Sequence, residues 1–544
     1  MYSMVFNEGV ADTYIRRGYW TPETLTDLCD RNAKEWPQKE AVVDSNTRLT
    51  WQQVKKQSDR LALGFLEMGL KKDDVVLTVL PNSVDLFSLF VAFEKAGIIM
   101  VGIPPTFRRT EIEPILKQTG AIGAVVRWQF RGFDYYKMIH DIQWDLSLLR
   151  YIFISGEAVP DGAISLNKIG RQASGEKYYE PYFDNTKITA FEICRFATTS
   201  GSTGVPKVMT SVFCAHLATA KVWARRVGFT HDDIVGALYN IVGGGVFTLS
   251  KIVAPLFGAK VALLEHFSAH DACELIEKER VTVLAGVPAA FAKILMYPDI
   301  GKYDLSSLRL IYNSTSLLPY ETGLALEEKF SCPVVQSYGA MDAGTITCTS
   351  VNDPHDVRLR TVGKPYDYNE LKLVNEEGEE VALGEIGEVT VRGAHMGERY
   401  FRNPELMREK WINGWFKVGD LGRLDERGNL TLVGRKDNLI IRGGRNIAPE
   451  EIEDLLIQHP QVSEVAVVRI PDPVMGEKAC VCVVPKRGER ITFEEILSFL
   501  KNKDLAPFKL PERLEIFEKL PIVAAGQKVD RKQLEKYVAQ RLGP

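Results

Sequence analysis

Between residues 22 and 125, short apolar segments alternate with amphipathic segments, and this alternation limits the possible folds more than any other feature of the chain. The segment 74–81 is almost continuously apolar, as strands buried on both faces of a parallel sheet are. The segments 50–70 and 84–97 place apolar residues at helical spacing, and the second ends at Gly97, a residue type common at helix C-termini. Alternating strands and helices predict a parallel sheet covered by helices.

The alternation returns between residues 233 and 320, and the pattern changes at about residue 365. From 365 to 434, polar and apolar residues alternate between glycine turns, which predicts β-hairpins. With 544 residues, the chain is too long for a single core. We therefore expect an α/β fold with a large N-terminal domain over residues 1–434. This domain would contain two helix-covered β-sheets plus a small β-barrel at 365–434, and a small, mobile α+β C-terminal lid domain would follow over 435–544.

The composition is that of an ordinary globular protein: 45% of the residues are hydrophobic, 25% are charged, and the net charge is −4. No long basic stripe is present, so nucleic acid is not an expected partner. The sequence contains no run of 18 apolar residues and no secretory leader pattern, so we expect no membrane span. The eight cysteines lack the spacing of a metal site and imply no disulfides, so we expect a cytoplasmic protein.

The run TTSGSTGVPK at 198–207 combines small, hydroxylated and turn-forming residues with one lysine. Gly201 and Gly204 permit close backbone approach, and Lys207 adds a compact positive charge. Hydroxyls and bare N–H groups in such a run can surround a phosphate, although a flexible linker has a similar composition. The spacing does not fit a Walker A loop, because the two glycines are three apart and Pro206 precedes the lysine. The hydroxyl-bearing residues are Thr198, Thr199, Ser200, Ser202 and Thr203.

This run resembles the phosphate loop of the adenylate-forming superfamily, which contains acyl-CoA synthetases, nonribosomal adenylation domains and luciferases. Four further segments resemble motifs of that family and occur in the same order: SYGAMDAG at 337–344, WFKVGDLGRLDERG at 415–428, GRKDNLIIRGGRNIAPEEIE at 434–453 and LPIVAAGQKVDRKQL at 520–534. The resemblance covers nearly the whole chain. It implies two half-reactions, in which a carboxylate first attacks the α-phosphate of ATP to give an acyl-adenylate, and a thiol then displaces AMP.

The resemblance also implies an ATP site with Mg²⁺. Asp342 stands where the family normally has glutamate, and a carboxylate there coordinates Mg²⁺. Tyr338 would stack beside adenine, Asp420 would accept hydrogen bonds from the ribose hydroxyls, and Arg435 would contact ribose or phosphate. The loop residues that would hold the phosphates are Thr199, Ser200, Gly201, Ser202, Thr203, Gly204 and Lys207. Further residues expected around the nucleotide are Gly339, Ser314 and Thr315, the last two from the stretch YNSTS at 312–316.

The C-terminal motifs imply a catalytic lysine and a hinge. Lys528 would bridge the carboxylate and the α-phosphate and stabilise the charge that develops between them. The family pattern runs Gly-Lys, whereas Gln527 intervenes here, so Lys532 is the alternative. Asp437 occupies the position of the hinge residue about which the lid rotates between half-reactions. Gly443, Gly444 and Arg445 would then line the passage of the thiol arm.

The acid pocket is expected between the segments 238–247, 312–316 and 337–341. Three glycines leave space there and apolar side chains supply walls. The hydroxybenzoate branch of the family has a histidine–asparagine pair near this place, whereas this chain offers Asn240 without a histidine. This difference favours a small, mostly apolar acid, either aromatic such as benzoate, alicyclic or short and unsaturated. The predicted pocket residues are Tyr239, Asn240, Val242, Gly243, Gly244, Gly245, Phe247 and Met341.

Two thiols remain open as acceptors. Basic residues in the lid favour coenzyme A (CoA), whose 3′-phospho-ADP carries negative charge, but a stand-alone enzyme that loads a carrier protein is the alternative. Two other classes of protein fit less well: a P-loop NTPase would need a Walker motif, and a non-catalytic binding protein would lack Asp420, Arg435 or Lys528. Either a monomer or a homodimer is compatible with the sequence. The basic lid residues are Arg442, Arg445, Lys478, Lys486 and Arg487.

Overall fold

The computed structural model describes residues 8–172, 183–199, 206–397, 399–442, 445–472, 474–503, 505–523 and 529–542. The chain divides into two compact units. The first comprises Met1–Glu370 and Val391–Phe416, and the second comprises Leu371–Thr390 and Lys417–Pro544. The mixed α/β architecture, with a larger N-terminal and a smaller C-terminal part, confirms the predicted fold class. The domain boundary between residues 434 and 435 stays a prediction.

The first unit contains a nine-stranded sheet whose central strands are parallel and whose outer strands are antiparallel. Its strands are β18 (Lys364–Pro365), β17 (Gly344–Cys348), β16 (Val334–Ala340), β15 (Leu310–Asn313), β14 (Val283–Gly286), β12 (Ile234–Ala237), β13 (Lys260–Leu263), β1 (Glu40–Val43) and β2 (Arg48–Thr50), in spatial order. The turn between β16 and β17 carries Asp342, and the chain after β15 carries Ser314 and Thr315.

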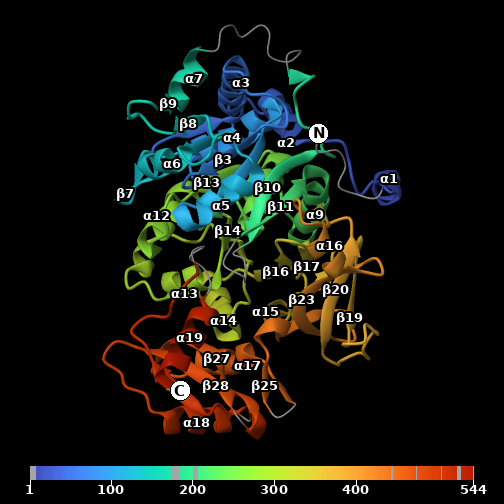
Figure 1. Cartoon of the computed structure of the whole chain (residues 1–544), viewed down its shortest axis with the longest axis vertical. Helices are drawn as coiled ribbons and strands as arrows, with labels where there is room; N and C mark the ends of the chain where they lie inside the picture. Colours follow the sequence, from blue (N-terminus) through green and yellow to red (C-terminus); the bar gives the residue numbers. More distant parts are fainter. Residues whose placement is uncertain are drawn as a thin grey trace. The chain divides into compact units, whose positions relative to one another are not determined.

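A second sheet of the same unit has eight strands, of which β10 and β11 lie side by side (Figure 1). Its strands are β21 (Arg399–Tyr400), β11 (Lys207–Val212), β10 (Ile193–Thr199), β4 (Ile99–Ile103), β3 (Val75–Val79), β5 (Gly123–Val126), β8 (Tyr151–Ile154) and β9 (Ile164–Ser165), in spatial order. All pairings from β10 to β9 are parallel, and the two pairings that involve β11 are antiparallel. A short hairpin, β6 (Gln129–Phe130) with β7 (Phe133–Asp134), completes the strands of this part of the chain.

Several helices of the first unit begin or end at capping residues. Thr24 and Thr50 accept hydrogen bonds from the third residue of α2 and α3, and each helix start forms a capping box. α4 ends at Gly97, which has a φ of 77°, as its position in the sequence predicted. The helices are α1 (Glu8–Arg16), α2 (Leu25–Glu35), α3 (Trp51–Glu67), α4 (Val84–Ala96), α5 (Arg109–Thr119), α6 (Tyr135–Gln143), α7 (Leu166–Gln172), α9 (Phe213–Val227), α10 (Gly244–Thr248), α11 (Ala254–Phe257), α12 (Ala269–Glu279), α13 (Pro288–Leu295), α14 (Tyr320–Phe330), α15 (His355–Arg360) and α16 (Pro404–Lys410).

Two features of these helices bear on the site. α4 is buried at every position except Asp85, so it forms part of the core and not a surface layer. Between α10 and α11 the chain forms a π-helical turn, Leu249–Val253, a geometry that is often found at functional sites. A short 3₁₀ turn, Ile300–Lys302, follows α13.

The strands predicted over residues 365–434 form a five-stranded sheet. It contains β19 (Asn369–Val374), β20 (Gly387–Gly393), β23 (Trp415–Leu424) and β22 (Trp411–Ile412), with β24 (Leu430–Arg435) beside β23. A further five-stranded sheet of the second unit contains β26 (Arg445–Ile447), β25 (Ile440–Arg442), β28 (Gly476–Pro485) and β27 (Val462–Asp472), with β29 (Arg513–Ile516) beside β28. The helical elements there are α17 (Pro449–Leu456), α18 (Phe493–Asn502) and α19 (Arg531–Leu542), with 3₁₀ turns at Lys436–Asn438 and Pro507–Lys509.

All eight cysteines are buried free thiols, as their spacing predicted. Cys480 and Cys482 lie on one face of β28 and pack against Leu534 and Val538 of α19. Among the described residues, no helix is both long and apolar enough to cross a membrane.

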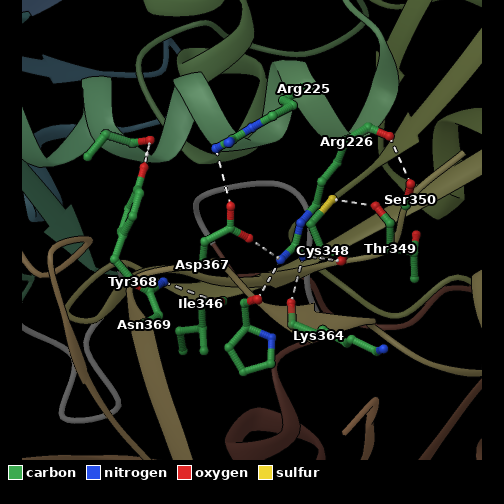
Figure 2. Close-up of polar contacts among 12 residues, drawn as sticks. Arg225, Arg226, Ile346, Cys348, Thr349, Ser350, Lys364, Asp367, Tyr368 and Asn369 are labelled. Atoms are coloured by element: carbon green, nitrogen blue, oxygen red, sulfur yellow. Dashed lines mark hydrogen bonds and ion pairs between the residues drawn. The ribbon is translucent and has the colours of Figure 1, made fainter. Parts of the chain in front are cut away.

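Arg226, near the end of α9, ties that helix to the nine-stranded sheet (Figure 2). Its guanidinium donates hydrogen bonds to the carbonyl of Cys348 at 2.8 Å and to the carbonyl of Lys364 at 2.9 Å. Ser350 donates in turn from its hydroxyl to the Arg226 carbonyl at 2.9 Å. Because α9 follows β11 directly, these bonds connect the two large sheets.

His395, in the chain between β20 and β21, is 1% exposed, and neither ring nitrogen has a hydrogen-bond partner among the described residues. Burial lowers the pKa of His395 to about 3 from an ordinary value of 6.5. The unfolded chain therefore binds a proton below pH 6.5 that the folded chain does not bind until the pH approaches 3. His395 contributes its full share of stability above pH 6.5, and this share is lost as the pH falls.

We expect the free energy of unfolding of the first unit to fall on acidification below pH 6.5, with His395 contributing about 1.4 kcal/mol per pH unit. Replacing His395 by Leu removes that contribution, so the slope between pH 6 and 4.5 becomes shallower. Denaturant unfolding of both proteins over this pH range measures the slopes. The control is the exposed His231, whose replacement by Leu should leave the slope unchanged. Equal slopes for the parent and for His395→Leu would show that His395 is not buried in its neutral form.

Candidate active site

The predicted phosphate loop connects two antiparallel strands of the eight-stranded sheet. β10 and β11 pair so that Thr199 lies opposite Lys207 at the open end of the hairpin. Gln118 of α5 donates from Nε2 to the Pro206 carbonyl at 3.3 Å. The two ends of the loop are therefore held by strand pairing and by this amide. The side chain of Thr199 and the predicted ligands Ser200, Gly201, Ser202, Thr203 and Gly204 lie outside the described residues.

Lys207 and Asp342 lie on either side of one tyrosine. The Tyr400 hydroxyl donates a hydrogen bond to Oδ2 of Asp342. The Lys207 ammonium lies 5.9 Å from the centroid of the Tyr400 ring. Tyr400 belongs to β21, which pairs with β11 so that Tyr400 faces Met209. The structure thus brings together the predicted phosphate-binding lysine and the predicted metal-binding carboxylate, and it adds a residue that sequence reasoning did not single out.

Tyr338 and Gly339 lie on β16, a few residues before Asp342. Tyr338 is buried, with 7% of its surface exposed. At Gly339 the pairing with β17 shifts, and a Cβ built there would lie 2.3 Å from the carbonyl oxygen of Gly344. Only glycine fits this backbone contact. The strand therefore places Tyr338 in the core and leads directly into the turn with Met341 and Asp342.

Ser314 and Thr315 follow β15, and both meet the hydroxyl of Tyr239. The Tyr239 hydroxyl lies 2.9 Å from Ser314 Oγ and 3.3 Å from Thr315 Oγ1, and it accepts a hydrogen bond from the Val246 N–H at 3.2 Å. Thr315 has a φ of 82°, an uncommon value for a residue with a branched Cβ. Such a conformation persists where surrounding contacts hold it, and the Tyr239 hydroxyl is one such contact.

The predicted pocket glycines leave less free space than their lack of side chains indicates. A Cβ on Gly244 would lie 2.9 Å from the Tyr239 hydroxyl, and a Cβ on Gly245 would lie 2.6 Å from Ser314 Oγ, while Gly243 has no neighbour within 4 Å. Asn240 donates to the Leu80 carbonyl at 3.0 Å and accepts from the Val242 N–H at 3.1 Å. Both polar groups of the Asn240 side chain thus shape the loop from 239 to 242.

Phe247 lies beside two buried basic side chains that sequence reasoning missed. The Arg195 guanidinium lies 3.5 Å from the Phe247 ring centroid, and Arg195 donates to the Val242 carbonyl at 2.9 Å. The Lys251 ammonium lies 4.5 Å from the ring centroid of Phe90 and 5.0 Å from that of Phe247. Arg195 interrupts the apolar strand ICRFATT and Lys251 interrupts the apolar run LSKIV, and these interruptions were the available signal.

Two pKa shifts follow from this arrangement. Burial lowers the pKa of Lys251, which is 4% exposed and belongs to the π-helical turn. Desolvation of the ring, together with the positive charges of Arg195 and Lys251, lowers the pKa of His216 well below its usual range. His216 contacts Ser211 through Nε2 and packs edge-on against Phe247. We infer that His216 is neutral at pH 7.

In the second unit, Asp420 and Arg435 form an ion pair across two neighbouring strands. Asp420 lies on β23 opposite Arg435 on β24, and Arg435 Nε donates to Asp420 Oδ1 at 2.8 Å. Asp420 is 8% exposed, so its carboxylate is held by the sheet and by this arginine. The two residues predicted to contact ribose are therefore adjacent.

The predicted hinge and thiol loop follow Arg435 directly. Asp437 lies in the 3₁₀ turn Lys436–Asn438, and its carbonyl accepts a hydrogen bond from Arg469 at 3.1 Å. The Arg445 guanidinium lies 5.0 Å from the ring centroid of Phe508. Gly443 and Gly444 lie outside the described residues.

Lys528 also lies outside the described residues, but the chain on both sides of it is described. Ile522 and Val529 form an isolated antiparallel bridge, so the segment that contains Lys528 begins and ends at paired residues. Arg531, at the start of α19, donates to the carboxylate of Glu453 at 2.5 and 2.7 Å and to the Val467 carbonyl at 2.6 Å. Lys532 is exposed on α19.

Comparison with known proteins agrees with these motifs. The family model "AMP-binding enzyme" matches residues 29–401, and the model "AMP-binding enzyme C-terminal domain" matches residues 451–527. The 2,3-dihydroxybenzoate-AMP ligase of Bacillus subtilis (strain 168) is 28% identical over 536 residues, which cover 98% of this chain and 97% of that protein. The medium-chain acyl-CoA ligase ACSF2, mitochondrial, of Rattus norvegicus is 30% identical over 554 residues, which cover 96% of this chain and 88% of that protein.

Among solved structures, the anthranilate CoA ligase AuaEII in complex with anthranoyl-AMP superposes with a TM-score of 0.85 at 26% identity, covering 96% of this chain and 98% of that one. The fold and the sequence motifs define an adenylate-forming enzyme, an ATP-dependent acid–thiol ligase. The chain belongs to the AMP-binding enzyme family.

The buried lysine beside Phe247 gives a stability prediction. Among the described residues, no acceptor lies within hydrogen-bond distance of the Lys251 ammonium, and methionine has a similar length without the polar group. We expect Lys251→Met to keep or raise the free energy of unfolding, by up to about 2 kcal/mol, because a desolvated ammonium is removed and no side-chain hydrogen bond is lost. Denaturant unfolding measures the change.

Lys95 is the matched control, because it is also buried, at 1% exposure, but pairs with Asp30 at 2.8 Å and with Asp59. Lys95→Met should lower the free energy of unfolding by about 1.5–3 kcal/mol, since it removes a hydrogen-bonded ammonium from the buried Asp59 and the half-buried Asp30 and leaves Lys55 as their partner. A loss of the same size in Lys251→Met would contradict the absence of an acceptor for its ammonium.

Proposed function

We propose that this enzyme is an acyl-CoA ligase for a small aromatic, alicyclic or short unsaturated carboxylic acid. ATP converts the acid to an acyl-adenylate with release of pyrophosphate, and CoA then takes the acyl group with release of AMP. The observation that carries the proposal is that Lys207 and Asp342 both interact with Tyr400. In adenylate formation, Lys207 would bind phosphate and Asp342 would bind a cation. The reaction is reversible in principle.

In the first half-reaction, a carboxylate oxygen of the acid forms a bond to the α-phosphorus of ATP, and the bond from that phosphorus to the pyrophosphate oxygen breaks. Lys207 and the loop from 199 to 204 would hold the β- and γ-phosphates. Asp420 would accept hydrogen bonds from the ribose hydroxyls, and Arg435 already stands beside it. Tyr338 and Gly339 on one side, and Ser314 and Thr315 on the other, would enclose the adenine.

The residues present fit a Mg²⁺ ion. Oδ2 of Asp342 accepts the Tyr400 hydrogen bond, whereas Oδ1 has no hydrogen-bond partner among the described residues. Mg²⁺ in nucleotide sites commonly takes one or two carboxylates and completes its shell with phosphates and water. Asp342 would hold the ion, and a bound Mg²⁺ would neutralise negative charge on the phosphates.

The composition of the predicted pocket is the reason for assigning the substrate to the class of small, mostly apolar acids. Tyr239, Val242 and Met341 supply a largely apolar wall, and the Tyr239 hydroxyl is already engaged with Ser314. Relatives whose names specify dihydroxybenzoate, salicylate and anthranilate support an aromatic acid, while the medium-chain relative supports an aliphatic one. Asn240 stands without a neighbouring histidine, which disfavours a catechol.

CoA is the proposed thiol, and a stand-alone enzyme that loads a carrier-protein pantetheine is the second candidate. The 2,3-dihydroxybenzoate-AMP ligase relative favours that second candidate. Two of the basic lid residues are already paired within the second unit, Arg442 with Glu512 and Lys478 with Asp472. Electrostatic attraction of the negatively charged 3′-phospho-ADP of CoA would therefore depend on Arg445, Lys486 and Arg487.

A lid over residues 435–544 would rotate about Asp437 between the half-reactions, and Gly443, Gly444 and Arg445 would reach the thiol in the second half-reaction. The enzyme would be cytoplasmic, a location that the eight free thiols support. The enzyme would act as a monomer or a homodimer.

We expect a panel of small carboxylic acids to support ATP–pyrophosphate exchange in the presence of Mg²⁺. Benzoate-type, alicyclic and short unsaturated acids should be active, and long-chain fatty acids should not, because Tyr239 and Ser314 fill the space beside Gly244 and Gly245. Adding CoA or a pantetheinylated carrier protein to active mixtures identifies the acceptor through thioester formation. Exchange with long-chain acids alone would contradict the assigned acid class, and no exchange with any acid would contradict the adenylation itself.

We expect Lys528→Ala to slow adenylation about 10²–10³-fold while sparing thioester formation from a preformed acyl-adenylate, because the lysine acts on charge that develops only in the first transition state. Single-turnover assays of each half-reaction measure the two effects. Lys532→Ala is the control, since Lys532 is exposed on α19, four residues further along the chain. If Lys532→Ala loses adenylation and Lys528→Ala keeps it, Gln527 has shifted the catalytic position.

A further inference from the structure

Tyr400 is the side chain at which the two large sheets of the first unit meet the predicted ATP site. It comes from β21 in the eight-stranded sheet, whereas Asp342 comes from the β16–β17 turn of the nine-stranded sheet. The hydrogen bond from the Tyr400 hydroxyl to Asp342 Oδ2 therefore joins a residue of one sheet to a residue of the other. No motif in the sequence analysis includes Tyr400.

The backbone and ring of Tyr400 are held firmly. Tyr400 pairs with Met209 across β11, and the next residue, Phe401, donates from its N–H to the Val208 carbonyl at 2.9 Å. The Tyr400 side chain is 6% exposed and packs with Ala197 and Met209, with Met341 beside them. Because the ring cannot move freely, the direction of its hydroxyl is set by the strand pairing.

A phenol that donates to a carboxylate makes a charge-assisted hydrogen bond, which is stronger than a bond between neutral groups. It restricts the rotation of the Asp342 carboxylate and leaves Oδ1 available for a cation. Aspartate is one methylene shorter than the glutamate expected at this position, so the hydroxyl of Tyr400 defines the place that this shorter side chain occupies.

The ring of Tyr400 has a second contact, with the Lys207 ammonium at 5.9 Å from its centroid. An ammonium at this distance from an aromatic ring is weakly attracted to it. No ion pair between Lys207 and Asp342 is present among the described residues. Both charged groups therefore remain available to an outside ligand.

We propose that Tyr400 is a positioning residue for the nucleotide: it orients the Asp342 carboxylate towards the divalent cation of Mg·ATP. This inference rests on the proposed function, because it assumes that Asp342 serves a metal and Lys207 serves phosphates. The competing reading is that Tyr400 only fills the space between Ala197, Met209 and Met341, in which case its hydroxyl has no role in binding.

Tyr400→Phe separates the two readings, because it keeps the ring and removes only the hydroxyl. Calorimetric titration without the acid substrate measures the binding of Mg·ATP, and titration of AMP with EDTA measures the binding of the nucleoside end alone. We expect Tyr400→Phe to weaken Mg·ATP binding about tenfold, the loss typical of one hydrogen bond to a charged group, and to leave AMP binding unchanged. The thermal unfolding midpoint of the variant reports any loss of packing.

Tyr368 supplies a matched control in the same unit. Its hydroxyl also donates a hydrogen bond, to the carbonyl of Ala218 on α9, the helix that carries Arg226 (Figure 2). Tyr368→Phe should lower the unfolding midpoint and leave Mg·ATP binding unchanged. If both tyrosine variants weaken Mg·ATP binding equally, the effect comes from general destabilisation and the inference is overturned.

A double variant tests whether Tyr400 acts through Asp342. We expect Asp342→Ala to weaken Mg·ATP binding, and the addition of Tyr400→Phe to that variant to cause no further loss. Additive losses would overturn the inference, since Tyr400 would then act independently of Asp342. Unchanged Mg·ATP binding in Tyr400→Phe would overturn it as well, while leaving the proposed function intact. If the parent protein binds neither Mg·ATP nor AMP, the proposed function fails and this inference fails with it.

Discussion

The hydrogen bond from Tyr400 to Asp342 is the contact on which the candidate site depends most, because strand pairing relates residues only within each large sheet. Pairing of β10 with β11 sets the position of Lys207, and pairing of β16 with β17 sets the position of Asp342, but neither pairing relates one residue to the other. Side chains must provide that relation. Tyr400 does so at the site, and Arg226 does so at the far end of α9, where it donates to the carbonyls of Cys348 and Lys364. A carboxylate from one sheet and a lysine from the other thereby interact with the same tyrosine.

Local patterns in the sequence predicted much of this framework. The helical spacing of α3, the glycine after α4 and the apolar strand β3 each encode their structure within a few residues. The two motif residues Lys207 and Asp342 were also predicted individually. Tyr400 could not be predicted in the same way, because its role depends on the pairing of β21 with β11, which lie nearly two hundred residues apart in the chain. Nothing in the surrounding sequence, GERYFRN, indicates that this tyrosine lies on a strand paired with β11.

The pocket residues show a different limit of sequence reasoning. A glycine in the sequence shows that no side chain is present, but it does not show which neighbouring atoms fill the space that a side chain would take. At Gly244 the Tyr239 hydroxyl occupies it, and at Gly245 the side chains of Ser314 and Tyr312 do. Similarly, the sequence around residue 251 did not indicate that Lys251 would be buried beside Phe90 and Phe247. Burial of its ammonium is costly, and the aliphatic stem of the lysine offsets part of that cost by packing among apolar side chains.

The second unit constrains where the proposed hinge can rotate. The Lys436 ammonium pairs with Glu388 of β20 at 3.0 Å, and Arg435 pairs with Asp420 of β23, so the side chains of these two residues are bound to the five-stranded sheet that contains β20 and β23. The Asp437 carbonyl instead accepts from Arg469 of β27, which belongs to the sheet of the lid. The backbone between these two attachments comprises ψ of Lys436 and the two dihedrals of Asp437. A rotation placed there changes neither the ribose-binding pair nor the lid sheet. A rotation one residue earlier would break the pairing of Lys436 with Glu388, and one residue later would pull Asp437 away from Arg469. The hydrogen bonds on either side therefore favour the position that the sequence motif assigned to the hinge.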